Sequence, residues 1–158
     1  MTIHRPRTRA LHLITSITLL PIILAACESG PKASTTPPSP ESLYNDWTLA
    51  TLAGNSVSEL VPQGARLPSL SIARDGKVSG YTSINALGSS LDQTALTNGR
   101  FALGPIMTTR RAGAPQLMAV ESLFVDSLRK ADTYAVAGNT LTLSQGPEEL
   151  MTMTGAAK

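Results

Sequence analysis

Short segments of this chain alternate apolar and polar residues, which is the pattern of strands with one buried face. Residues 47–52 form the first such segment, and residues 70–73 and 78–81 form a pair around Asp75 and Gly76. An Asp-Gly step between two alternating runs predicts a β-hairpin, because its turn needs positive φ angles. Asp75 is therefore expected to serve this turn.

Two further steps that combine glycine and asparagine predict hairpins for the same reason. They are Asn98-Gly99, ahead of residues 101–103, and Gly138-Asn139, between residues 133–137 and 140–144. Residues 150–154 predict a last short strand.

Residues 115–130 contain no glycine and repeat apolar residues at three- and four-residue spacing, as an amphipathic helix does. The apolar stripe is expected to comprise Leu117, Met118, Val120, Phe124, Val125 and Leu128. Pro115 suits the first helical turn, and Arg129 and Lys130 suit the negative end of the helix dipole. Together the elements predict an α+β fold, an antiparallel β-sheet curling into a small barrel-like structure with one packed α-helix.

The N-terminal segment has the pattern of an export signal. Three arginines precede an apolar run at residues 11–26, which is shorter than the roughly twenty residues of a membrane-spanning helix. The run ends in Leu24-Ala25-Ala26-Cys27, the pattern of a lipobox. We expect a signal peptide at residues 1–26, cleaved between Ala26 and Cys27.

Cys27 is the single cysteine of the chain, and lipidation explains a lone thiol in an exported protein. We expect acyl chains such as palmitate on Cys27 to anchor the protein to a bacterial membrane, facing the periplasm. Glu28, where an aspartate would retain lipoproteins at the inner membrane, favours the outer membrane. The alternative is an uncleaved anchor, or an ordinary signal with an accidental cysteine.

Residues 27–42 are rich in serine, threonine and proline, which predicts a disordered tether ahead of a domain at residues 43–158. Removing the signal takes three arginines from the 13 basic residues, so ten remain against 11 acidic ones. The net charge then falls from +2 to about −1, and no basic footprint for nucleic acid remains.

Both histidines, His4 and His12, leave with the signal. The mature chain therefore lacks the residues for Ser-His-Asp or Cys-His catalysis and for histidine or cysteine zinc sites. We expect no metal site and no cofactor. Glu148-Glu149 is the close carboxylate pair, and it is expected in a loop as solvated surface charge.

Two segments, GKVSGYTSINALG from Gly76 and LGPIMTTRRAG from Leu103, carry a family likeness. With a Trp-x-Leu strand at Trp47 and Leu-Thr-Leu at residues 141–143, the chain resembles the META domain, also called the HslJ-like family, over roughly residues 47–154. In that family a G-x-x-G-C-N motif follows the first hairpin, and a T-T-x-x-A-C motif precedes the helix.

The chain departs from both motifs. Ile84 and Gly113 stand where the family pattern has its cysteines, and Gly80-Tyr81-Thr82-Ser83 departs from the G-x-x-G. The joint loss implies that the two cysteines normally meet, as a disulfide or a close contact. We therefore expect Ile84 and Gly113 to lie close together, with their Cα atoms within roughly 7 Å.

Asn85 matches the asparagine of the family, and Thr108, Thr109 and Arg110 match its second motif. Two roles stay open for Asn85, contact with a ligand at the barrel mouth or bracing of a turn. The threonines are expected to finish a strand, and Arg110 to pair with a carboxylate. On the helix, Glu121 and Asp126 are expected to pair with Arg129 or Lys130.

The resemblance implies a non-enzymatic envelope lipoprotein linked to stress response and outer-membrane integrity. Three interpretations follow: a tethered binding or chaperone-like module for a lipid or an envelope protein, a purely structural or protein-interaction lipoprotein, and a carboxylate-dependent hydrolase. An apolar cavity inside the barrel would favour the first, and a filled interior would favour the second.

Overall fold

The computed structural model describes residues 39–156. The predicted signal peptide, Cys27 and most of the predicted tether lie outside the described residues. The strands are β1 (Asp46–Leu52), β2 (Asn55–Ser56), β3 (Ser69–Ile72), β4 (Lys77–Tyr81), β5 (Ala86–Ser90), β6 (Met107–Thr108), β7 (Thr133–Ala137), β8 (Thr140–Gln145) and β9 (Glu148–Gly155). The helices are α1 (Pro40–Leu43), α2 (Val57–Leu60), α3 (Gln93–Thr97) and α4 (Pro115–Lys130).

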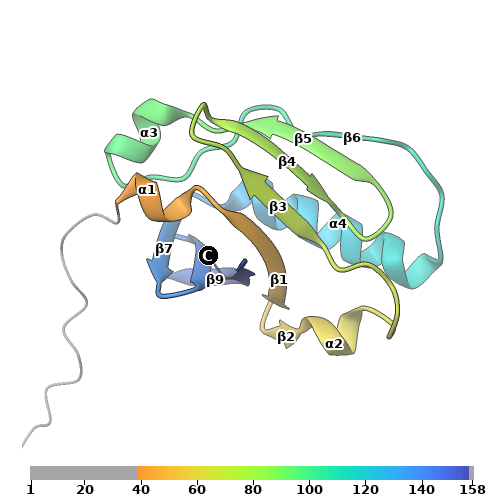
Figure 1. The fold of residues 1–158 in the computed structure, drawn as a ribbon. Helices are drawn as coiled ribbons and strands as arrows, with labels where there is room; N and C mark the ends of the chain where they lie inside the picture. Colours follow the sequence, from red (N-terminus) through yellow and green to blue (C-terminus); the bar gives the residue numbers. More distant parts are fainter. Residues whose placement is uncertain (1–38, 157–158) are drawn as a thin grey trace, which may run out of the picture. The chain divides into compact units, whose positions relative to one another are not determined.

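The strands form one antiparallel sheet in the order β6-β5-β4-β3-β1-β9-β8-β7, and β2 pairs with β1. The helix α4 crosses one face of the layer made by β3, β4 and β5 (Figure 1). The predicted α+β class is confirmed, with three short helices in addition to the expected one.

The segment from Arg100 to Leu103 joins the two ends of this sheet. Leu103 bridges to Leu91 just after β5, and Arg100 bridges to Thr133 at the start of β7. The sheet therefore curls into a barrel-like structure. Strand β6 is the last strand of the order and pairs with β5 alone, so the barrel is open along the other edge of β6.

Strand β1 buries Trp47, Leu49 and Leu52, which strict alternation does not allow. Its register against β9 shifts between Leu49 and Thr51. This bulge gives the strand one extra residue, so Leu52 returns to the buried face.

Two of the three predicted hairpins are confirmed. Gly76 adopts a φ of 83° between β3 and β4, and Asp75 Oδ1 accepts a hydrogen bond of 2.9 Å from the Lys77 amide. Gly138 adopts a φ of 58° between β7 and β8, where Ala137 pairs with Thr140.

The predicted hairpin at Asn98-Gly99 is wrong. Asn98 is the C-terminal cap of α3, and Gly99 follows it with a φ of 71°. Asp92 begins this helix, because its carboxylate accepts hydrogen bonds from the Thr94 and Ala95 amides. A glycine with positive φ ends helices as readily as it turns hairpins. Among residues 101–103, Leu103 consequently forms an isolated bridge, with Leu91, in place of the expected hairpin.

The last strand is longer than predicted. Glu148 and Glu149 belong to β9 and are exposed, rather than lying in a loop, and the turn before them is Gly146-Pro147. At the other end of the domain, α1 takes up residues predicted as tether, and Leu43 within it is fully buried.

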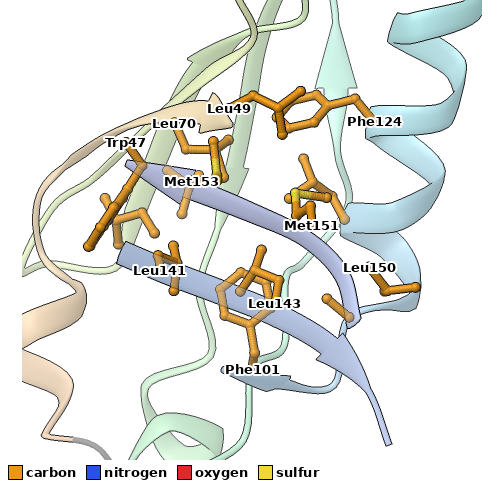
Figure 2. Packing of buried hydrophobic residues seen from close by; sticks show 14 of the residues in the cluster. Trp47, Leu49, Leu70, Phe101, Phe124, Leu141, Leu143, Leu150, Met151 and Met153 are labelled. Atoms are coloured by element: carbon orange, nitrogen blue, oxygen red, sulfur yellow. The ribbon is translucent and has the colours of Figure 1, made fainter. Parts of the chain in front are cut away.

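Helix α4 has the predicted bounds, and Val120, Phe124, Val125 and Leu128 are buried as expected. Met118 was expected in the apolar stripe but is 46 % exposed. Figure 2 shows Phe124 pointing from α4 towards the side chains of β1 and β9.

Side chains fill the interior of the described domain. Trp47, Phe101 and Phe124 are each at most 2 % exposed, and leucines and methionines of β1, β8 and β9 surround them (Figure 2). The Trp47 indole donates a hydrogen bond of 2.8 Å to the Leu43 carbonyl oxygen, which fixes α1 to the core. Burial, and secondarily the neighbouring Tyr44, raises the pKa of Tyr134 in this core.

Candidate functional site

The side chain of Asn85 joins the two sequence motifs. It is 3 % exposed, and its Oδ1 accepts hydrogen bonds of 2.8 Å from the Arg111 amide and from Thr109 Oγ1. Its Nδ2 donates to both carboxylate oxygens of Glu121 at 3.0 Å and to the Arg111 carbonyl oxygen at 3.2 Å. Because both lone pairs and both N–H groups are engaged, Asn85 braces the segment that follows β6.

Glu121 completes this network from the helix side. Thr82 Oγ1 donates a hydrogen bond of 2.6 Å to Glu121 Oε2, so neutral donors from the β4–β5 connection hold the carboxylate. Glu121 therefore does not make the predicted pair with Arg129 or Lys130. Asp126 makes that pair with Arg129, at 3.1 Å.

The Asn85–Glu121 network, defined as Thr82, Asn85, Thr109, Arg111 and Glu121, thus ties three segments together. The β4–β5 connection, the chain after β6 and the helix α4 converge on it. Their relative position is fixed by side-chain hydrogen bonds rather than by strand pairing.

Ser83 lies beside this network in a backbone conformation that suits glycine. Its φ is 84°, it is 6 % exposed, and its hydroxyl has no hydrogen-bond partner. Left-handed backbone costs a residue with a β-carbon about 1–2 kcal/mol. This conformation explains the second glycine of the family pattern G-x-x-G at this position.

The predicted neighbourhood of Ile84 and Gly113 is confirmed. A β-carbon on Gly113 would lie 2.9 Å from Ile84 Cγ1 and 3.3 Å from Ile84 Cγ2. The isoleucine side chain therefore occupies the space that a side chain at position 113 would need. At the two positions where the family pattern has cysteines, this chain has an isoleucine packed against a glycine.

A surface groove opens between the chain after β6 and the helix α4. We call it the β6–α4 groove. Its two parts enclose about 350 and 230 Å³ and share Thr108, Glu121 and Ser122. The remaining lining residues are Asn85, Thr109, Arg110, Arg111, Ala112, Met118, Val125, Asp126 and Arg129.

Positive charge and one exposed methionine, Met118, line this groove. The ion pairs among residues 39–156 are Glu41–Arg74 and Asp126–Arg129. The expectation that Arg110 pairs with a carboxylate is therefore wrong within this range, and Arg111 is unpaired too. Met118 on α4 lines the groove and is 46 % exposed, whereas Met107 on β6 is 71 % exposed but is not among the lining residues.

The four predicted motif residues, Asn85, Thr108, Thr109 and Arg110, line one part of the groove together. Thr108 ends β6 as predicted, and the amide of Thr109 still bonds to the Ala86 carbonyl oxygen at 3.1 Å. In the part of the chain that the structure describes, no group of three or more histidine, cysteine, aspartate or glutamate residues is placed to hold a metal.

Sequence reasoning missed Glu121, Thr82 and Arg111. A signal for Glu121 was present, because it stands four residues after Leu117 and seven before Leu128, inside the apolar stripe of the helix. A carboxylate in such a stripe must find hydrogen-bond donors when the helix packs. No comparable signal marks Arg111, because its backbone, not its side chain, contacts Asn85.

Within residues 39–156, no helix has the length and hydropathy needed to cross a membrane.

Comparison with known proteins gives both a family and a fold. The META domain family model matches residues 41–158. This chain is similar to the NMR structure of a protein from Burkholderia xenovorans, with a TM-score of 0.58 and 20 % sequence identity. The match covers 82 % of this chain and 98 % of the other chain. A DUF4847 family protein from Bacteroides vulgatus covers 73 % of this chain and 94 % of its own, with a TM-score of 0.51 and 11 % identity. Among curated proteins, none matches the chain.

Proposed function

The chain belongs to the META domain family, and we propose that it is a lipid-anchored envelope protein whose domain binds other proteins without catalysing a reaction. Its binding surface in this proposal is the β6–α4 groove. Its role is in envelope integrity or stress.

The contrast between interior and surface carries this proposal. The interior is filled by side chains such as Trp47, Phe101 and Phe124. Proteins that bury a small ligand or an acyl chain enclose a mostly apolar cavity, and the buried side chains of this domain instead pack into one hydrophobic cluster. The groove instead offers two unpaired arginines and one exposed methionine, and arginine and methionine are enriched where proteins bind proteins.

A non-enzymatic role is supported by how the polar groups of the site are used. Asn85 and Glu121 hydrogen-bond to each other. Glu121 also accepts a hydrogen bond from Thr82, and Asn85 accepts hydrogen bonds from the chain after β6. A general acid or base needs a proton-transfer path to a substrate. Glu148 and Glu149, the carboxylate pair of the hydrolase interpretation, are successive residues of β9, and successive strand side chains point to opposite faces.

Export and lipidation are supported by the N-terminal sequence alone. The basic start, the apolar run and Leu-Ala-Ala-Cys form the pattern from which we propose lipidation of Cys27. Palmitate-analogue labelling of cells that express the full chain should mark the protein, and Cys27→Ser should abolish the label. Label that persists in Cys27→Ser would refute lipidation at this residue.

Photo-crosslinking in living cells tests the binding surface. A benzophenone amino acid at Met118, and separately at Ala112, is expected to capture a discrete protein partner, because both positions line the groove and are exposed. Lys77 is the matched control position, because it is exposed and lies in a hairpin away from the groove.

Equal crosslinking from Lys77 and from the two groove positions would contradict the proposal. So would the complete absence of crosslinks at Met118 and Ala112 in cells where the protein is present at the membrane.

A further inference from the structure

The edge strand β6 keeps backbone groups free for pairing. The amide of Thr109 bonds to the Ala86 carbonyl oxygen, and Met107 and Thr108 pair with Gly88 and Leu87 of β5. In an antiparallel pair, alternate residues direct their N–H and C=O groups to the same neighbour. The N–H and C=O of Thr108 therefore point away from β5, at the edge where the barrel is split.

The groove lies along this free edge. Thr108 lines both of its parts, which hold about 350 and 230 Å³. The opposite wall is α4, through Glu121 and Ser122. An extended peptide can pair with an exposed strand edge while its alternate side chains enter neighbouring hollows.

The charges beside the edge select the kind of peptide. Arg129 is neutralised by Asp126, and the Glu121 carboxylate is held by Thr82 and Asn85. Arg110 and Arg111 follow Thr108 directly, are exposed and form no ion pair within residues 39–156. Unpaired guanidinium groups favour carboxylates.

We propose that the occupant of the β6–α4 groove is an extended acidic peptide segment of the partner protein, which adds to the free edge of β6 as a further strand. This inference rests on the proposed function and names the chemistry of its partner. Backbone pairing at Thr108 supplies the geometry, and Arg110 and Arg111 supply the preference for acidic side chains.

A peptide titration of the full chain in detergent micelles tests this inference. The probe is acetyl-Thr-Glu-Val-Glu-Val-Glu-Thr-amide, measured by calorimetry or by anisotropy of a labelled form. One comparison peptide replaces each glutamate by glutamine. A second carries N-methyl groups on alternate residues, which blocks strand pairing without any change to the protein.

Thr108→Pro removes the outward N–H while keeping the bonds to β5, and should weaken binding about tenfold. Arg110→Gln with Arg111→Gln should weaken it about fivefold, because two exposed charge contacts are lost. Arg66→Gln with Arg100→Gln is the matched control, which removes two exposed arginines outside the groove and should leave binding unchanged.

Two results would overturn the inference. One is equal binding of the N-methylated and unmodified peptides, and the other is no binding of the acidic peptide at all. Binding to anionic lipid vesicles that is unaffected by Thr108→Pro, without peptide binding, would assign the arginines to a membrane surface instead. Crosslinks at Met118 in cells without peptide binding would contradict this inference alone, whereas peptide binding without cellular crosslinks would contradict the proposed function.

Discussion

At the scale of single residues, Asn85 shows what sequence motifs can and cannot predict. The family likeness singled out Asn85, Thr108 and Thr109, and two of these three residues hydrogen-bond to each other. The motif did not reveal that the partner of Asn85 is a carboxylate on a distant helix. That contact spans 36 residues of sequence and depends on how α4 packs, which local patterns do not specify.

Glu121→Gln is expected to destabilise the domain. Asn85 Nδ2 lies 3.0 Å from both oxygens of Glu121, so a glutamine amide would place two donors against each other. We expect a loss of about 1–2 kcal/mol in the free energy of unfolding, measured by urea unfolding followed through Trp47 fluorescence. The amide of Arg111 should also exchange hydrogen faster.

Asp126→Asn is the control for this change, because it removes a carboxylate of the same helix from an exposed ion pair. Its effect should stay within about 0.5 kcal/mol. Equal effects of the two variants would mean that the network does not stabilise the domain.

Ser83→Gly is expected to stabilise the domain. It relieves a φ of 84° and removes a buried hydroxyl that has no partner. These gains exceed the entropy that glycine loses on folding, so we expect about 1–2 kcal/mol of added stability in the same urea experiment. Ser79→Gly on β4 is the control and should destabilise by about 0.5–1 kcal/mol. A destabilised Ser83→Gly would show that Ser83 is not strained.

At the scale of elements, periodicity was reliable where an element is long and amphipathic. The bounds of α4 were predicted because four turns of helix repeat one apolar stripe. The short helix α3 was missed because Asn-Gly signals either a hairpin or a helix end, and five residues are too few to show a helical period. The bulge in β1 was also missed, since only the register with β9 reveals it.

The contact between Ile84 and Gly113 predicts that a disulfide can replace packing there. Gly113 is not among the glycines with positive φ, so it can be replaced. A β-carbon on residue 113 would lie 2.9 Å from Ile84 Cγ1. In a disulfide the β-carbon of one cysteine and the sulfur of the other are separated by about 3 Å. Ile84→Cys with Gly113→Cys should form a bridge when Cys27→Ser leaves only this pair. The oxidised protein should be about 3–4 kcal/mol more stable than its reduced form.

Gly113→Cys alone should destabilise the domain, because its side chain would collide with Ile84. Failure of the double variant to oxidise would show that the two positions are not aligned for a bridge.

At the scale of the whole molecule, the sequence predicted a curled antiparallel sheet but not how it closes. Closure depends on two isolated bridges, from Arg100 to Thr133 in β7 and from Leu103 to Leu91 just after β5. Residues 101–103 were expected as a hairpin strand, but no local pattern identifies Leu91 or Thr133 as the bridge partners. The split beside β6, and with it the β6–α4 groove, follows from that closure. Export and lipidation remain predictions from residues 1–27.

The most direct test of the account is whether the groove is covered in the living cell. Cysteine is introduced at Met118, which lines the groove and is exposed, in the lipid-anchored chain, and a maleimide reagent is applied to intact cells and to the purified protein. Protection of position 118 in cells, full labelling after purification, and labelling of a cysteine at Lys77 in both are predicted. Equal labelling of position 118 in cells and in the purified protein would contradict a role for this groove in binding a partner.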